Sequence, residues 1–359
     1  MTFVACTAGA VLAACAGHRG VPPTTTRPTL PPATTTTTVA PRPVAPLTGL
    51  AVSDAAVLTR PAVVVKIDNA PEARPQTGLA RADVIIEERV EGGIARFMAV
   101  FQSAEANVVG PVRSVRSTDP PVVRPIGGLF AYSGGIPPFV SLLHNEGGVV
   151  DVGADDDGSA YYRSKDRPAP HNLYTSTVAL RQRTPNGLAA PPRLFTFLPA
   201  AQTFTGAGAI PVSHLSVTMS SLSSGQWDWD PSTHSWLRST DGAPHIDQGS
   251  GQLAFTTVII QFVPYARTPY KDPAHSPVDE AEVIGTGEAW VLADGQLVKG
   301  TWSKPALADV TTYTDAAGAS IAIPPGHTWI TLAPLTATTL LGTVQNGTGT
   351  IPGRRRLAS

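Results

Sequence analysis

The chain has 359 residues, and its 26 Lys and Arg side chains are balanced by 27 Asp and Glu. This balance gives no general attraction to nucleic acid or to an anionic surface, so we expect no nucleic-acid partner. With two cysteines in all, Cys6 and Cys15, the sequence excludes a disulfide-rich scaffold and a cysteine-rich zinc module. Composition leaves the function open, and local patterns must supply it.

The first segment of the chain is short and apolar. Residues 2–14 are small or apolar, too few to span a bilayer, and typical of a secretory signal peptide. The string L-A-A-C (12–15) resembles a bacterial lipobox, in which the cysteine thiol carries a diacylglyceryl group. The resemblance implies a signal peptide over 1–14, lipidation of Cys15 and attachment to the outer face of the cell membrane. No Lys or Arg precedes the apolar stretch, which a mis-assigned start codon explains; a plain secretory signal stays the alternative.

A polar spacer follows this segment. Thr and Pro occupy 17 of the 31 positions from 16 to 46. Such a segment cannot bury apolar surface, and its prolines favour an extended backbone. We therefore expect residues 15–46 to be the lipidated cysteine and a disordered linker between the membrane and a folded body.

The first half of the body, residues 47–205, has mixed α and β patterns. Short runs rich in β-branched and aromatic residues predict strands at 62–69, 83–90, 95–102 and 129–133. Helical spacing predicts one helix at 138–146 and another at 172–183, with Asn172 as its cap.

The second half, residues 206–340, shows strands and turns without a helical period. Strands are predicted at 213–219, 226–229, 234–239, 253–263, 282–292, 296–303 and 327–333. Asp294-Gly295 predicts a two-residue hairpin turn. Trp227 and Trp229 share one strand face, which we interpret as core rather than as a sugar-stacking platform. Residues 341–359 lose the apolar pattern and are expected to be a disordered basic tail.

Several long motifs resemble the YerB-like family of bacterial lipoproteins. They are P-L-T-G-L (46–50), K-I-D-N-A-P-E-A-R-P-Q-T-G-L (66–79), A-D-V-I-I-E (82–87), V-E-G-G-I-A-R-F-M-A-V-F-Q (90–102), G-P-V-R-S-V-R (110–116), A-P-H-N-L-Y-T (169–175), H-I-D (245–247), V-I-I-Q-F-V (258–263) and G-H-T-W-I (326–330). The resemblance covers about residues 46–335. It implies an α+β protein, with a mixed α/β N-terminal half and a β-rich C-terminal half packed as a layered β-β-α sandwich. It implies no established reaction, and it favours a place beside cell-wall assembly factors.

A group of polar residues in the first half could bind an anion. A loop led by Gly110-Pro111 carries two arginines three positions apart, and guanidinium groups bind phosphate and carboxylate in a bidentate way. The candidate ligand residues are Arg74, Glu91, Arg96, Arg113, Arg116, His171 and Asn172. The alternative is an internal network in which Glu87 and Glu91 pair with these arginines and hold the loops. The network is favoured for Arg96, and the ligand role for Arg113 and Arg116.

Catalytic and metal patterns are weak. A glycosidase would need two carboxylates at a defined separation, which Asp68, Glu87 and Glu91 could supply only if they were free of arginine. Ser133 lacks the motif of a nucleophile elbow, and the acidic turn at 155–157 lacks the spacing of a calcium loop. We assign no catalytic residue, metal or cofactor.

Two classes of function stay open. The first is a non-catalytic, membrane-tethered binding or scaffold protein of the envelope, whose partner is a cell-wall polymer or a wall-assembly protein. The second is an envelope enzyme that acts on glycans or phosphorylated wall precursors through an Arg/Glu cleft.

Overall fold

The computed structural model describes Gly20 and residues 43–155, 158–199, 201–272 and 275–343. The expected signal peptide, Cys15 and most of the expected linker therefore lie outside the described residues. From residue 43 onward the described chain forms one compact unit. Strands outnumber helices, and the larger sheet is mixed, so the protein belongs to the α+β class.

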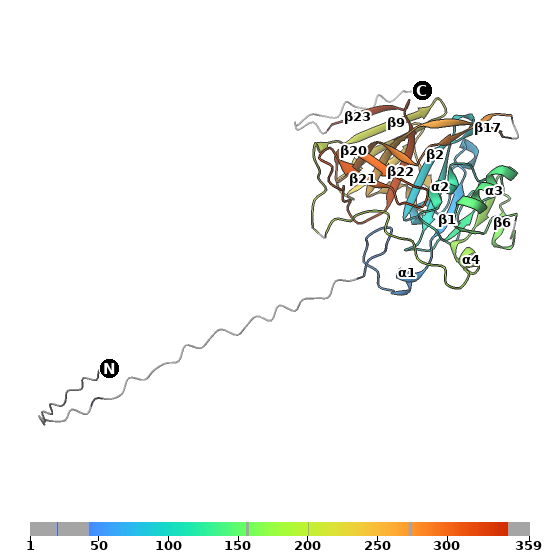
Figure 1. Ribbon diagram of the computed structural model, residues 1–359, viewed down its shortest axis with the longest axis horizontal. Coiled ribbons are helices and arrows are strands. Elements are labelled where there is room, and N and C mark those ends of the chain that lie inside the picture. The colour runs from blue at the N-terminus through green and yellow to red at the C-terminus, as the bar shows by residue number, and fades with distance from the viewer. Residues whose placement is uncertain (1–19, 21–42, 156–157, 200, 273–274, 344–359) are drawn as a thin grey trace, which may run out of the picture. The chain divides into compact units, whose positions relative to one another are not determined.

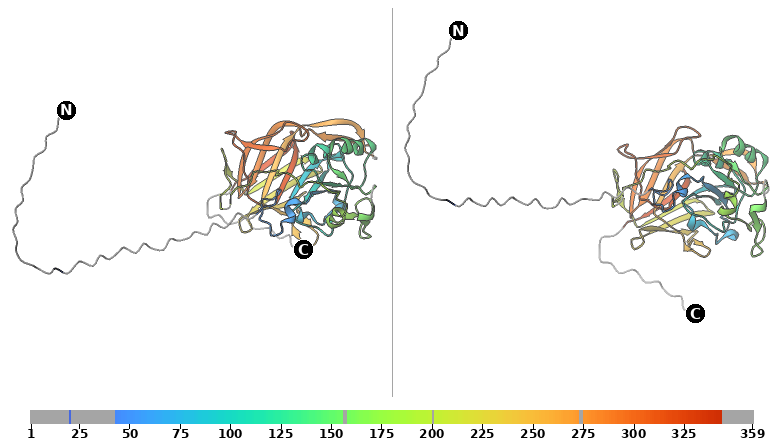
Figure 2. Two further views of the ribbon diagram at one scale, coloured as in Figure 1. Left: turned by 60° about the horizontal axis from the view of Figure 1, so that its bottom comes forward. Right: turned by 90° about the horizontal axis from the view of Figure 1, so that it is seen from below.

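An 11-stranded sheet takes strands from both halves of the sequence (Figures 1 and 2). Its order is β21 (Thr312–Asp315), β20 (Gln296–Lys304), β19 (Gly285–Ala293), β16 (Thr257–Val263), β22 (Thr328–Pro334), β2 (Val84–Arg89), β3 (Ala95–Phe101), β1 (Val63–Ile67), β4 (Leu129–Ala131) and β5 (Val150–Asp151), with β8 (Ile210–Pro211) paired to β20. Strand β22 lies between β16 and β2 and runs parallel to both. The expected boundary at 205–206 thus divides the sequence, while one sheet joins the two parts.

A smaller sheet and three two-stranded pairs complete the β structure. The smaller sheet has the order β12 (Ala243–Pro244), β11 (Ser235–Thr240), β10 (Ser223–Asp230), β9 (His214–Ser220) and β23 (Thr338–Gly342), with β15 (Ala254–Phe255) paired to β11. The pairs are β6 (Tyr161–Arg163) with β7 (Leu173–Thr175), β13 (Ile246–Asp247) with β14 (Gly251–Gln252), and β17 (Tyr265–Lys271) with β18 (Pro277–Ala281).

The helices are short. The described residues contain α1 (Ala56–Thr59), α2 (Asp119–Val123), α3 (Pro137–Glu146) and α4 (Thr177–Arg181), with 3-10 turns η1 (Pro71–Ala73), η2 (Leu79–Arg81), η3 (Glu91–Gly93) and η4 (Gly158–Ala160). Helix α3 confirms the prediction at 138–146. The prediction at 172–183 is wrong at its start, because residues 173–175 pair with β6 as a strand. The cap of α4 is Ser176 rather than Asn172.

Both faces of the large sheet are buried, and alternate side chains along each strand fill two separate clusters. On one face, Phe97 joins a cluster with Trp227 and Trp236 of the smaller sheet. On the other face, Met98 joins a cluster with Val123 of α2 and Phe139 of α3. Trp227 is fully buried and Trp229 is partly buried against the same cluster, which agrees with their interpretation as core.

The hairpin turn predicted at Asp294-Gly295 is present. It joins β19 to β20, and both residues have positive φ (48° and 68°), as a turn of this tightness requires. No helix in the described part of the chain is long and apolar enough to cross a membrane.

Two expected boundaries change. Val44 forms a bridge with Ala51, and Ala45 is fully buried, so the last residues of the expected linker belong to the folded body. At the other end, Leu341 and Gly342 pair with β9, so the first residues of the expected tail are in a strand. In both places backbone pairing orders residues whose local composition does not predict structure; the first pairing is local, and the second joins distant parts of the chain.

Candidate functional site

The candidate polar residues gather at one edge of the large sheet. Strands β1 and β2 both run antiparallel to β3, so their carboxyl ends lie together. Asp68 follows β1, Glu91 follows β2, and Arg96 is the second residue of β3. Backbone hydrogen bonds to the end of β1 hold the loop 110–116 across this edge. The fold thereby brings Arg116 to Glu91, one of the two expected acidic partners, and Arg113 to Asp68, which was not expected as a partner.

Glu91 is the centre of a buried ion-pair network. Gly92 and Gly93 have positive φ (69° and 78°), which allows the tight connection that places Glu91 between β2 and β3. Arg96 Nη2 donates to Glu91 Oε1 at 2.7 Å, and Arg116 Nε donates to Glu91 Oε2 at 2.6 Å. A further Arg116 nitrogen, Nη2, donates to Glu91 Oε1. One carboxylate therefore holds two guanidinium groups.

The network lowers the pKa of Glu91. Burial acts to raise that pKa, but the hydrogen bond from Arg116 and the charges of both arginines outweigh it and lower the pKa to about 2. The remaining Arg116 nitrogen, Nη1, donates to the carbonyl of Val115 at 2.8 Å, and the Arg116 side chain is only 9% exposed. These contacts fit the network alternative for Arg116 as well as for Arg96.

Arg113 has a different environment. Its Nε lies 3.2 Å from Asp68 Oδ2 as an ion pair without hydrogen-bond geometry, and its side chain is 22% exposed. Within the described residues, no hydrogen bond is formed by its two terminal nitrogens. His171 Nδ1 lies 2.7 Å from the same Asp68 oxygen. We call these three residues the Asp68 cluster: a buried carboxylate that orients one arginine and one histidine.

Arg74 and Asn172 hold the loops around the Asp68 cluster. Arg74 donates to the backbone and side chain of Asn69 and forms an ion pair with Asp241 at 2.8 Å. Asn172 accepts from Arg163 at 2.8 Å and donates to the carbonyl of Ser164 at 3.0 Å. Both side chains are thus used within the protein.

The sequence did not single out an exposed tyrosine on the hairpin that carries His171. Tyr162 of β6 is 50% exposed and stacks on Tyr174 of β7, with ring centroids 5.8 Å apart at 23°. Strand β7 directly follows His171 and Asn172, so this aromatic pair lies on the same hairpin as the histidine. The Y-Y-R string was the available signal, but a local pattern cannot tell which tyrosine is exposed.

Glu87 lies on the opposite face of the sheet from the Glu91 network. It accepts from Arg238 Nη2 at 2.8 Å and from Thr331 Oγ1 at 2.9 Å. The Arg238 guanidinium lies 4.1 Å from the ring centre of Trp329 and 4.6 Å from that of Trp227, all within the buried space between the two sheets. This carboxylate is enclosed, and it faces away from the other two carboxylates considered for a glycosidase.

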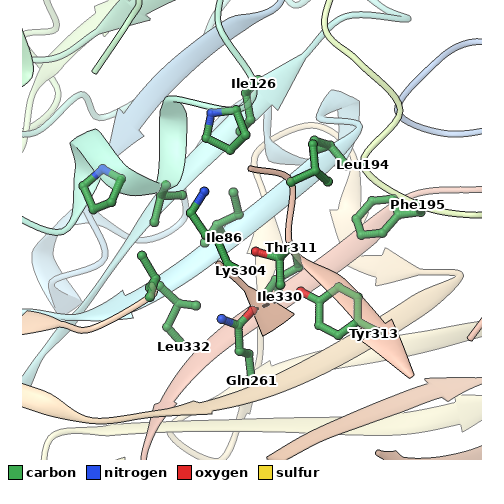
Figure 3. Close-up of a pocket in the computed structure, with 15 residues that line it drawn as sticks. Ile86, Ile126, Leu194, Phe195, Gln261, Lys304, Thr311, Tyr313, Ile330 and Leu332 are labelled. Carbon is green, nitrogen blue, oxygen red and sulfur yellow. Dashed lines mark hydrogen bonds between the residues drawn. The ribbon is translucent and has the colours of Figure 1, made fainter. Parts of the chain in front are cut away.

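An apolar pocket, also missed by the sequence, opens on the helix-covered face of the sheet (Figure 3). The empty space in and in front of it is about 510 Å³, which includes open solvent. Its lining includes Ile86, Ile126, Leu194, Phe195, Ile330, Leu332 and, among polar residues, Gln261, Lys304 and Tyr313. Burial lowers the pKa of Lys304 to about 8, and its ammonium donates to the carbonyl of Leu307 at 2.8 Å. The lining residues come from distant parts of the chain, so no local motif marks them.

The described part of the chain contains no group of three His, Cys, Asp or Glu side chains arranged to hold an ion. The polar side chains around the loop 110–116 form the Glu91 ion pairs and the Asp68 cluster.

Together these features define an α+β protein whose two sequence halves share one sheet and whose edge carries an ion-paired polar cluster. Residues 47–188 match the model described as "Protein of unknown function (DUF3048) N-terminal domain", and residues 215–330 match the corresponding C-terminal domain. The chain belongs to this family, that of the YerB-like lipoproteins, as its motifs predicted.

The sequence of a Bacillus subtilis protein and a crystal structure from the same organism agree with this assignment. The chain is 29% identical over 312 residues to "Putative lipoprotein YerB" of strain 168, across 81% of this chain and 86% of the relative. A crystal structure of the YerB protein superposes with a TM-score of 0.70 at 26% identity, across 83% of this chain and all of that one.

Proposed function

We propose that the chain is a membrane-tethered, extracytoplasmic binding protein of the cell envelope that acts without catalysis. The proposal rests on the ion pairs that the carboxylates of the candidate site form. Glu91 is held by two arginines, Asp68 by an arginine and a histidine, and Glu87 by Arg238. A hydrolase of the glycosidase type needs one carboxylic acid and one carboxylate that are both free to reach the substrate, and these three carboxylates are already engaged by cationic side chains.

The Asp68 cluster and Tyr162, on the hairpin that carries His171, form the proposed binding surface. Arg113 has terminal nitrogens that can donate to a phosphate or carboxylate, and His171 adds a ring nitrogen beside it. Tyr162 offers an exposed aromatic face for a sugar. An anion site with an exposed aromatic side chain on the hairpin of its histidine fits an acidic glycopolymer of the wall, which is the partner we propose.

Co-sedimentation of the full chain with purified wall sacculi tests this surface. Arg113→Lys keeps the charge but removes the two-pronged donor, so we expect binding to fall roughly tenfold. Tyr162→Ala should weaken binding through loss of stacking. Arg267→Lys is the matched control, because Arg267 is an exposed arginine paired with Asp279 at 3.4 Å elsewhere on the surface. Equal binding by all three variants and the unaltered chain would refute the proposed surface.

The Asp68–His171 pair favours a second candidate, an envelope enzyme. A buried carboxylate that accepts from Nδ1–H leaves Nε2 of the imidazole able to take a proton from water or a hydroxyl group. Incubating the full chain with the same sacculi and measuring soluble sugar and phosphate release tests this candidate. Release that His171→Gln abolishes would establish an enzyme; no release would leave only the binding proposal.

The membrane anchor and the layering of the fold are part of this proposal. The lipobox-like string and the lipoprotein name of the relative support lipidation of Cys15 and a place on the outer face. Cys15→Ala should move the protein from the membrane fraction to the medium, and a fully membrane-bound variant would reject the anchor.

Two buried clusters on opposite faces of the large sheet support the β-β-α layering.

A further inference from the structure

Three ionisable side chains that the proposed function does not use meet inside the protein. Lys66 comes from β1, Glu88 from β2, and Asp119 from the first residue of α2. All three side chains are 0% or nearly 0% exposed. Lys66 Nζ lies 2.6 Å from Asp119 Oδ1 and also donates to Glu88 Oε1. We call this group the Lys66 triad.

The Lys66 triad is enclosed by apolar side chains and by one arginine. On the sheet face that carries the triad, the neighbouring positions are Val64, Ile86 and Met98, and Arg96 lies opposite Glu88; all four are fully or almost fully buried. Glu88 Oε2 is buried and has no hydrogen-bond partner among the described residues. Burial raises the pKa of Glu88 to about 7, in spite of the nearby charge of Lys66. One amine is therefore enclosed with two carboxyl groups, one of which holds a proton near neutral pH.

The geometry of Asp119 favours attack by the amine. Its Oδ1 faces Lys66 Nζ, while its Oδ2 accepts the backbone N–H of Arg116 at 2.7 Å. A hydrogen bond on Oδ2 polarises the carboxyl group and would stabilise negative charge on that oxygen during attack at the carbon. Both reacting groups are held in place by regular secondary structure, which keeps the Lys66 amine in contact with the Asp119 carboxyl group.

We propose that Lys66 and Asp119 join in an intramolecular isopeptide bond and that Glu88 carries the protons of this reaction. Proton transfer within the triad first converts the ammonium and the carboxylate into a neutral amine and a carboxylic acid, which a dry site favours over charges. The amine nitrogen then bonds to the Asp119 carboxyl carbon. The bond from that carbon to Oδ1 breaks, and Oδ1 leaves as water with two protons that came from the nitrogen through Glu88.

The products balance the reactants. One ammonium and one carboxylate become one amide and one water, and Glu88 ends with the proton it had at the start. No oxidant or cofactor is required. The bond would close a loop between residues 53 positions apart. Both cysteines precede residue 16, so the folded body has no cysteine with which to form a disulfide. An amide link is therefore a covalent constraint still open to this exported domain.

Peptide mapping of the full chain tests the bond directly. Trypsin cuts after Lys66 in the denatured protein only if the Lys66 amine is free. We expect no peptide beginning at Ile67, and instead a branched peptide joining the segments that contain Lys66 and Asp119, lighter by one water than the two segments together. Cleavage after exposed Lys299 in the same digest controls for complete digestion.

The result on the unaltered chain decides the proposal. A complete release of the peptide that begins at Ile67 would overturn it, and so would a branch to the peptide that contains Glu88. Glu88→Gln keeps the shape of the side chain but cannot carry the proton, so we expect the cross-linked fraction to fall at least tenfold. An unchanged cross-linked fraction in that variant would refute the role of Glu88.

Discussion

Separate lysine substitutions of Arg113 and Arg116 compare a partly exposed arginine with a buried one in the same loop. Arg116 donates two hydrogen bonds to Glu91 and one to the carbonyl of Val115. A lysine ammonium cannot reproduce this planar set of donors, and its shorter reach leaves Glu91 short of at least one partner. Arg113 makes one ion pair without hydrogen-bond geometry, and the same substitution removes little from it.

The expected magnitudes follow from these contacts. Each hydrogen bond to a charged group contributes about 1.5–3 kcal/mol, so loss of one or two makes Arg116→Lys cost about 3 kcal/mol in the free energy of unfolding. A partly exposed ion pair contributes about 0–1 kcal/mol, so Arg113→Lys should stay within about 0.5 kcal/mol of the unaltered chain. The difference between the two variants is therefore about 2.5 kcal/mol by the same principles.

Urea unfolding followed by tryptophan fluorescence measures both variants. The midpoint should fall for Arg116→Lys with an unchanged slope, because the surface exposed on unfolding is the same. A double-mutant cycle with Glu91→Gln should show coupling to Arg116 and none to Arg113. Equal losses for the two lysine variants, or an Arg116→Lys variant as stable as the unaltered chain, would refute the assignment of Arg116 to a buried network.

Three further predictions follow from the structure. The pKa of Glu91 lies at about 2, below the ordinary 4.5. This group therefore contributes about 3 kcal/mol to the free energy of unfolding, which is fully present above pH 4.5 and lost as the pH falls toward 2. Acid unfolding of Glu91→Gln should lack this component. Arg238→Ala should cost about 3–5 kcal/mol in urea, because it leaves a buried carboxylate unpaired, whereas an unchanged midpoint would contradict the ion pair. Gly128→Ala should lower the melting temperature far more than Gly127→Ala: both glycines have positive φ, but an added Cβ meets the carbonyl of Ala62 at 2.2 Å only at position 128.

Local patterns were sufficient for much of the secondary structure. The apolar runs that became β1, β2 and β3 pack on both faces, and they read as strands because β-branched residues fit a buried sheet. The turn at Asp294-Gly295 was predictable because positive φ at two adjacent positions needs such residues. The start of the helix at 172–183 was not predictable, because the pairing of β7 with β6 overrode a helical spacing.

The candidate site was predictable in its members but not in their roles. The motifs around Glu91 and the loop 110–116 indicated a set of arginines and carboxylates that would meet. Which arginine is buried depends on how the loop crosses the sheet edge, and this placed Arg116 inward and Arg113 outward. Tyr162 and the Lys66 triad were not identified, since exposure and enclosure are properties of the packed molecule.

The sequence by itself determined the family, the lipobox-like start, the spacer composition and the order of most strands, because these depend on residues close together in the chain. Only the tertiary structure decided that strands of both halves form one sheet, that Glu87 pairs with Arg238 151 positions away, and that Lys66 is enclosed with two carboxyl groups. The physical reason is that an ion pair or a pocket depends on which distant side chains share a buried space, and on the solvent that this space excludes.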